Sequence, residues 1–202
     1  MARRFAERHL VIASHNAGKV REISTMLAPY RLRITSLADH GAPAPAETGA
    51  TCRDNAILKA KAAVAATGLP ALADDSGLEV AALDGWPGVQ TAEIGGPERD
   101  HEISMKRILE KLGDTKDRRA RMVCVLALAW PDGHIEAVEG EVRGQLVYPA
   151  RGLNGPWGGW GYDPYFQPEG HDKVFAEMPP EGKNALSHRA NALKALIHAC
   201  FA

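Results

Sequence analysis

The chain of 202 residues carries 24 basic and 25 acidic side chains, which gives a formal net charge of −1. This length suits one large domain with a substantial apolar core, so we expect a single domain over residues 1–202. A near-neutral charge argues against a basic surface that grips a nucleic-acid backbone. We therefore expect no nucleic acid polymer as a partner, although the charge leaves free nucleotides open as substrates.

Short apolar runs alternate along the chain with segments of helical periodicity. Residues 121–130 form the most apolar stretch, and Pro-Asp-Gly-His joins it to residues 135–147, which predicts a long antiparallel hairpin. Thr51 and Asp54 have the spacing of a helix N-cap, and Gly68 is a helix stop signal. Strand-loop-helix units with such a hairpin are typical of an α/β protein built on a mixed sheet. We further expect strands over residues 9–14, 31–37, 71–74 and 78–83, and helices over residues 20–27, 51–67, 98–112 and 187–201.

The three cysteines, Cys52, Cys124 and Cys200, lie far apart and lack the close spacing of a zinc site or a redox pair. No apolar run approaches the length of a membrane span, and the run at residues 10–13 is too short for a secretory signal. The sequence therefore predicts a cytoplasmic protein with reduced thiols and no membrane partner.

Two adjacent carboxylates, Asp74 and Asp75, follow an apolar run and precede a Ser-Gly pair that predicts a turn. Neighbouring carboxylates disfavour each other's ionisation unless a cation or hydrogen-bond donors neutralise them. Mg²⁺ is such a cation, because it prefers oxygen ligands and keeps waters that a carboxylate can deprotonate. In the alternative interpretation Asp74 caps the turn and Asp75 is solvated, and the pair alone does not decide between the two.

Residues 14–19 read Ser-His-Asn-Ala-Gly-Lys between a predicted strand and a predicted helix. Backbone N–H groups at a helix start favour an anion, and Lys19 would add a positive charge. A Walker loop is excluded because Ala13 stands where its first glycine belongs and Val20 follows the lysine. An ordinary Asn/Gly turn with a solvated lysine is the alternative.

Further polar groups occur in the following helix and near the C-terminus. Asn55 and Lys59 are four residues apart and share one helix face, although a solvated lysine is the default. Trp160 and Tyr162 flank Gly161, and Lys183-Asn-Ala-Leu-Ser-His-Arg follows later in the chain. Aromatic faces and cationic donors suit a nucleobase. The alternative is a core of aromatics with Ser187 as the cap of the last helix.

In this order and spacing, the segments together resemble those of the inosine triphosphate pyrophosphatase family, whose members remove non-standard purine nucleoside triphosphates. The resemblance spans nearly the whole chain. It is carried by residues 14–19, Glu47-Thr-Gly, Asn55-Ala-Ile-Leu-Lys-Ala, Asp74-Asp-Ser-Gly-Leu, Pro87-Gly-Val, Gly161-Tyr-Asp-Pro and Ser187-His-Arg.

The resemblance implies an α/β fold in which helices flank a long, twisted mixed β-sheet, with two lobes around a central cleft. It further implies a homodimer that uses Mg²⁺ to hydrolyse ITP, dITP and XTP to the nucleoside monophosphate and diphosphate. Such an activity keeps these purines out of DNA and RNA.

The resemblance also implies a role for each matched residue. Asp75 would accept the proton of the attacking water and would share the metal with Glu47. The triphosphate would lie against residues 14–19, and the base against residues 160–163 and the C-terminal cations. The implied substrate contacts are Ser14, His15, Asn16, Ala17, Gly18, Lys19, Ser76, Trp160, Gly161, Tyr162, Asp163, Lys183, His188 and Arg189.

Three positions depart from the family pattern: Trp160 replaces a phenylalanine, Glu93 stands where a cation is common, and His15 replaces a glycine. Two other functions stay open as alternatives. One is a septum-protein-type nucleotide pyrophosphatase, which the Gly161-Tyr-Asp and Ser187-His-Arg segments argue against. The other is a regulator that senses triphosphates without hydrolysing them, and it would need no water-activating carboxylate.

Overall fold

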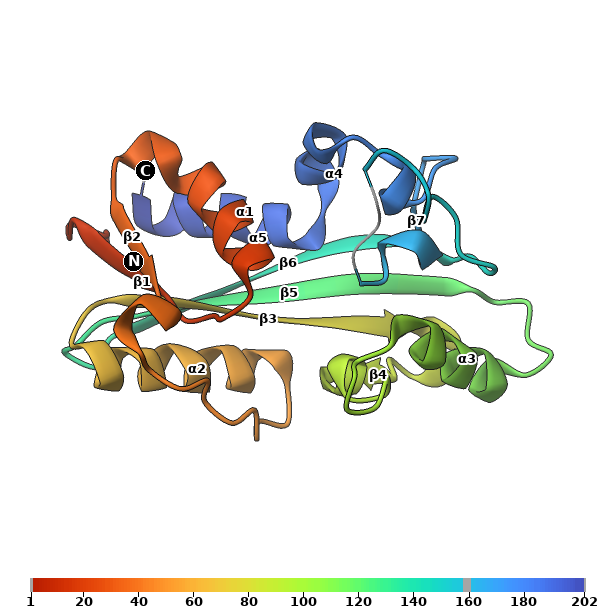
Figure 1. The fold of residues 1–202 in the computed structure, drawn as a ribbon, viewed down its shortest axis with the longest axis horizontal. Helices are drawn as coiled ribbons and strands as arrows, with labels where there is room; N and C mark the ends of the chain where they lie inside the picture. Colours follow the sequence, from red (N-terminus) through yellow and green to blue (C-terminus); the bar gives the residue numbers. More distant parts are fainter. Residues whose placement is uncertain (1, 158–160, 202) are drawn as a thin grey trace. The chain divides into compact units, whose positions relative to one another are not determined.

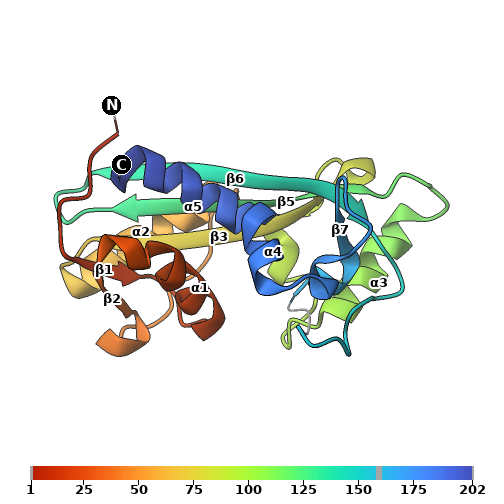
Figure 2. The same ribbon diagram turned by 90° about the horizontal axis from the view of Figure 1, so that it is seen from above.

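The computed structural model describes residues 2–157 and 161–201 (Figures 1 and 2). The strands are β1 His9–Ile12, β2 Arg33–Ser36, β3 Ala71–Val80, β4 Pro87–Gly88, β5 Arg119–Ala129, β6 Ile135–Leu146 and β7 Phe166–Pro168. The α-helices are α1 Ala17–Leu27, α2 Cys52–Thr67, α3 His101–Leu112, α4 Pro180–Leu186 and α5 His188–Leu196, and a π-helical turn over Ile197–Phe201 continues α5.

Strand pairing follows the order β2-β1-β3-β5-β6-β7, and β4 pairs with β3. Strand β1 runs parallel to β2 and β3, whereas β4 is antiparallel to β3 and β7 is antiparallel to β6. The predicted α/β class with a mixed sheet is therefore confirmed. The predicted hairpin of β5 and β6 is also confirmed, since Trp130 N donates to His134 O at 3.0 Å and Leu146 N donates to Arg118 O at 2.8 Å.

The chain divides into two compact units. Unit 1 comprises Met1–Asp75, Cys124–Gly140 and Ala192–Ala202, and unit 2 comprises Ser76–Val123 and Glu141–Asn191. Strands β3, β5 and β6 contribute residues to both. The single domain expected over residues 1–202 stays a prediction. Among the described residues, no helix is long and apolar enough to cross a membrane.

Helices cover both faces of the strands in unit 1. Leu10 and Leu72 pack in one apolar cluster with Ile23 of α1, whereas Ala73 and its neighbours on the opposite face pack with Ala60 of α2. Figure 1 shows α1 and α5 on one side of these strands and α2 on the other. Because successive side chains of a strand point to opposite faces, the next residues of β3 must continue this alternation between the α1 side and the α2 side.

Unit 2 has its own core between one face of the sheet and a covering of α3 with the 162–178 segment. Met105 and Ile108 of α3 share a buried cluster with Leu78 of β3, Phe166 and Phe175. The other face of these strands carries polar side chains. A β-strand with one covered face alternates in this way between apolar and polar residues.

The predicted turn at Asp74-Asp-Ser-Gly is wrong, because β3 runs without interruption from Ala71 to Val80. Both aspartates are buried and both have cationic partners, so the chain stays extended there. The C-terminal helix predicted over residues 187–201 begins at His188, since Ser187 is extended with ψ 154°. A separate helix, α4, precedes it and was not expected, because Pro180 and Gly182 obscure its periodicity.

Candidate active site

One buried lysine joins the two predicted metal ligands in unit 1. Lys59 Nζ lies 2.7 Å from Asp75 Oδ1 and 2.8 Å from Glu47 Oε1. Asp75 ends the unit-1 part of β3 on the face that α2 covers, so the strand alternation directs its carboxylate toward Lys59. The structure thus brings Glu47 and Asp75 to the same positive charge, and their roles as metal ligands stay predictions.

The loop that carries Glu47 is fixed to the start of α2. Gly49 N donates to the side-chain oxygen of the buried Asn55 at 2.7 Å. A Cβ at position 49 would lie 2.6 Å from the Cβ of Asp54, so only glycine fits. At the same helix end Thr51 and Asp54 form the predicted cap, in which each side chain accepts from the other residue's backbone N–H. This network places Glu47 opposite Lys59.

Burial and neighbouring opposite charges shift the pKa values of this cluster in opposite directions. Burial raises the pKa of Asp75, the charge and hydrogen bond of Lys59 lower it, and the nearby Glu47 raises it again, so that the net pKa lies above its usual value. Burial lowers the pKa of Lys59, but the charge and hydrogen bond of Asp75, the hydrogen bond of Glu47 and the charge of Asp74 outweigh it and raise that pKa. Asp75 is therefore a stronger base than an exposed aspartate, and the cause is its burial rather than the neighbouring Asp74.

Asp74 points the other way and pairs with the predicted phosphate loop. Lys19 Nζ lies 2.9 Å from Asp74 Oδ2, and the carboxylate is buried on the α1 side of β3. The side chain of Asn16 accepts from the backbone N–H groups of Gly18 and Lys19 and so caps α1. Two of the N–H groups expected to face an anion are thus bonded to Asn16.

The rest of the loop at residues 14–19 is held by its own side chains. Ser14 Oγ accepts from Asn16 N at 3.1 Å, and His15 Nε2 lies 2.9 Å from Ala42 O. Among the described non-glycine residues, positive φ angles occur elsewhere, so His15 needs no glycine conformation. His15, Ala17 and Gly18 are exposed, and their contact with a triphosphate stays a prediction.

The donor set of unit 1 suits Mg²⁺. Glu47 and Asp75 offer hard carboxylate oxygens that already converge on the ammonium of Lys59. Among residues 2–157 and 161–201, no group of three or more His, Cys, Asp or Glu could hold a metal ion by itself. Mg²⁺ needs no such cage, since it is usually held by one or two carboxylates, waters and substrate phosphates. The residues present therefore fit a magnesium ion shared with a phosphate.

Unit 2 holds the predicted base-binding residues. Asp163 is buried and accepts from Lys183 Nζ of α4 at 2.6 Å. Tyr162 is buried beside it, and its hydroxyl donates to Thr91 O at 3.2 Å. Burial raises the pKa of Tyr162 to about 12, so the hydroxyl keeps its proton. The structure thus joins Asp163 and Lys183 directly, whereas Trp160 lies outside the described residues.

The Ser-His-Arg segment starts α5. Ser187 Oγ accepts from Ala190 N at 3.2 Å, which makes Ser187 the helix cap that the sequence allowed. His188 and Arg189 are 5% and 7% exposed, so they are not solvated residues of a surface turn. Both have partners within the fold. Ser76 is half-buried in β3, and Glu93 is exposed.

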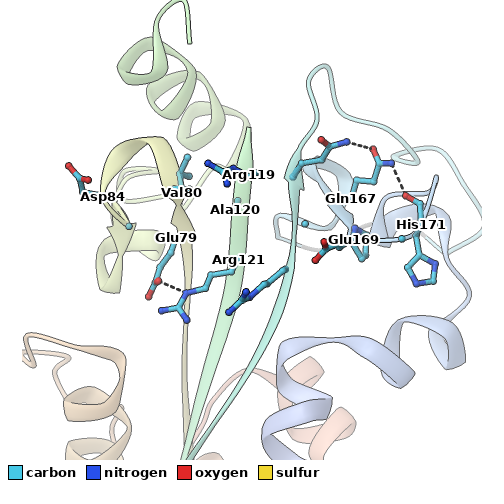
Figure 3. Close-up of a pocket in the computed structure, with 16 residues that line it drawn as sticks. Glu79, Val80, Asp84, Arg119, Ala120, Arg121, Gln167, Glu169 and His171 are labelled. Carbon is cyan, nitrogen blue, oxygen red and sulfur yellow. Dashed lines mark hydrogen bonds and ion pairs between the residues drawn. The ribbon is translucent and has the colours of Figure 1, made fainter. Parts of the chain in front are cut away.

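A cavity of about 940 Å³ opens on the uncovered sheet face of unit 2 (Figure 3). Arg121 lies on its floor and pairs with Glu79 at 2.7 Å, as the dashed line in Figure 3 shows, and with Glu141 at 2.6 Å. None of the predicted site residues that the structure describes is among the residues that line it. Arg119 and Arg143 also line the cavity, and they pair with Asp117 and Glu141, which lie outside its lining.

The model of the Ham1 family matches residues 10–199. The chain belongs to the Ham1 family. A dITP/XTP pyrophosphatase of Rhodospirillum centenum is 54% identical over 99% of this chain and 98% of its own length. A second dITP/XTP pyrophosphatase, of Gluconobacter oxydans, is 50% identical over 95% of this chain and 90% of its own.

Solved structures of Ham1 proteins have the same fold. The Coxiella burnetii protein superimposes with a TM-score of 0.86 at 37% identity, covering 94% of this chain and 96% of that one. The Staphylococcus aureus Ham1 protein gives 0.83 at 38% identity, covering 93% and 95%. The resemblance drawn from the sequence motifs is therefore confirmed.

Sequence reasoning did not assign three residues that the structure brings to these clusters. Lys59 was noted only for its helix face, and its link to Glu47 and Asp75 depends on a loop without periodicity. Cys52 hydrogen-bonds to Asp75, which helps to lower the pKa of that carboxyl. His101 contacts Tyr162 across the fold of unit 2, and no motif marked it.

Proposed function

We propose that this protein hydrolyses the non-standard purine nucleoside triphosphates ITP, dITP and XTP to the nucleoside monophosphate and inorganic diphosphate. The observation that carries the proposal is near full-length similarity to dITP/XTP pyrophosphatases within the Ham1 family. The enzyme would thereby remove these nucleotides before polymerases place them in DNA or RNA.

In the proposed reaction, Asp75 accepts a proton from the water that attacks the phosphorus. Its raised pKa supports this role, because a general base works best when its pKa lies near the working pH. Mg²⁺ bound by Glu47 and Asp75 would supply positive charge against the phosphate oxygens. Lys59 holds both carboxylates in place, and Lys19 would offset the charge of the leaving diphosphate.

We further propose that Lys183, His188 and Arg189 recognise the base in unit 2. Hypoxanthine and xanthine carry a keto oxygen that accepts hydrogen bonds where adenine carries an amino donor. A donor left unpaired in a buried site costs about 1–3 kcal/mol, which makes rejection of ATP a consequence of this donor set. The remaining proposed substrate contacts are Ser14, His15, Asn16, Ala17, Gly18, Ser76, Trp160, Gly161, Tyr162 and Asp163.

A homodimer is proposed as the working form, and the cytoplasm as its location, because the nucleotide pool used by polymerases lies there. Dimerisation is testable by sedimentation at micromolar concentration. A single species with the mass of two chains is expected, and a species with the mass of one chain would contradict it.

The activity is tested by measuring diphosphate and monophosphate release from ITP, dITP, XTP, GTP and ATP, with and without Mg²⁺. Rapid, Mg²⁺-dependent release of diphosphate from the first three is expected, with much slower release from ATP. Preferred cleavage of modified pyrimidine triphosphates would favour a septum-protein-type enzyme. Tight binding of ITP with no turnover would favour a sensor, and either result would refute the proposal.

A further inference from the structure

His101 is the first residue of α3 and packs against the turn that carries the proposed base-binding residues. Its ring centroid lies 5.0 Å from that of Tyr162, with the planes at 66° in an edge-to-face arrangement. Gly161 has φ +69°, and a Cβ at that position would lie 3.9 Å from Cε1 and Nε2 of the imidazole. The ring therefore packs against Tyr162 and lies beside Gly161.

Further contacts hold Tyr162, the neighbour of Asp163 in the chain. The hydroxyl of Tyr162 donates to Thr91 O, and its carbonyl accepts from Tyr165 N at 2.9 Å. His101 contacts the ring of Tyr162 and lies beside Gly161, so it limits rotation of the 161–163 backbone. Asp163 follows directly, and its carboxylate holds Lys183 at 2.6 Å.

The imidazole is suited to a packing role. Burial lowers the pKa of His101 although Asp100 and Asp163 act to raise it, so the ring is neutral at pH 7. A neutral ring carries no positive charge that would rival that of Lys183 at the carboxylate of Asp163. An edge-to-face aromatic pair fixes the relative orientation of its members and adds stability beyond the buried area alone.

We propose that His101 is a positioning residue for base recognition: its imidazole supports the 161–163 turn and thereby sets the direction of Asp163 and Lys183. The inference rests on the proposed function and names a residue of the same site that no motif marks. Because the contact involves the proposed base-binding turn and none of the proposed metal or general-base residues, we expect it to act on substrate affinity and to leave the chemical step alone.

The test compares His101→Ala, which removes the ring, with His101→Phe, which keeps an aromatic edge against Tyr162. We expect His101→Ala to raise the KM for ITP about three- to tenfold while kcat stays within about twofold of wild type. His101→Phe should restore most of the affinity. His171→Ala, at an exposed histidine of the same unit, is the matched control and should leave both constants unchanged.

A double variant tests the route through Lys183. In a Lys183→Met background, His101→Ala should change the KM less than about twofold, because the group that it positions is gone. An unchanged KM in His101→Ala, a fall in kcat alone, or the full effect in the Lys183→Met background would each overturn the inference. Failure of wild type to release diphosphate from ITP would instead refute the proposed function, so the two failures are distinguishable.

Discussion

The role of Asp75 can be tested without loss of the fold, because its partner Lys59 has a second carboxylate beside it. In Asp75→Asn the shape of the side chain is kept, and Lys59 still pairs with Glu47. We expect ITP hydrolysis to fall at least about a hundredfold, because the variant lacks both the base and one metal-binding oxygen. Diphosphate release measures the effect, and far-UV circular dichroism checks the fold.

Asp84→Asn is the control, since Asp84 is an exposed aspartate with φ +51°, a conformation that asparagine also tolerates. It should retain wild-type turnover. Full activity in Asp75→Asn would remove Asp75 from the catalytic role.

Arg189 is buried at the start of α5, where a donor for the keto oxygen of the base is proposed. We expect Arg189→Ala to lower the ITP/ATP ratio of kcat/KM more than it lowers kcat for ITP, because the loss falls on the interaction that distinguishes the bases. Arg189→Lys keeps a donor, so its ITP/ATP ratio of kcat/KM should lie between those of wild type and Arg189→Ala. Arg119→Ala removes a side chain that is 79% exposed and should leave the ratio unchanged. A ratio unaffected by Arg189→Ala would contradict the keto-reading role.

His101 also makes a predicted contribution to the pH dependence of stability. Its pKa in the folded chain lies below the usual 6.5, so the unfolded chain takes up the proton first as pH falls. The free energy of unfolding should therefore decrease as pH drops through 6.5 toward the lower folded pKa. His101→Phe should show a shallower decrease. Urea unfolding between pH 5 and pH 8 measures the difference, and identical slopes for the two proteins would refute it.

At the scale of elements, α2 matters because it carries Lys59 and begins beside the Glu47 loop. Its capping box joins Thr51 and Asp54 through two hydrogen bonds of 3.1 Å. Thr51→Ala should lower the free energy of unfolding by about 0.5–2 kcal/mol. Lys61→Ala, at an exposed position in the middle of the same helix, should cost clearly less, since it removes no cap. Urea titration of both variants decides this, and equal losses would contradict the cap.

The spacing of apolar residues along the chain predicted most of these helices and strands. Consecutive strand residues point to opposite sides of a sheet. The alternation along β1 and β3 therefore explains why Asp74 faces α1 and Asp75 faces α2. The continuity of β3 could not be foreseen, because Asp-Ser-Gly is ordinary turn chemistry unless buried partners hold it extended. The link from Glu47 to Lys59 depends on a loop held by Gly49 and Asn55, for which no periodicity exists.

At the scale of the whole molecule, the proposed roles divide between the two units. Lys19, Lys59 and their carboxylate partners belong to unit 1, whereas Asp163 and Lys183 belong to unit 2. The two sets of ion pairs share no residue. Substitutions in groups that share no partners have nearly additive effects on free energy.

This division predicts how parts of the substrate compete with ITP. Lys19→Ala should raise the inhibition constant of inorganic diphosphate about tenfold and leave that of inosine within about twofold, because a cation near phosphate contributes little to a neutral nucleoside. Lys183→Ala should have the reverse effect. Steady-state inhibition of ITP hydrolysis in Mg²⁺ measures both constants. If either variant weakened the binding of both inhibitors equally, phosphate binding and base recognition would not be separable functions of the two units.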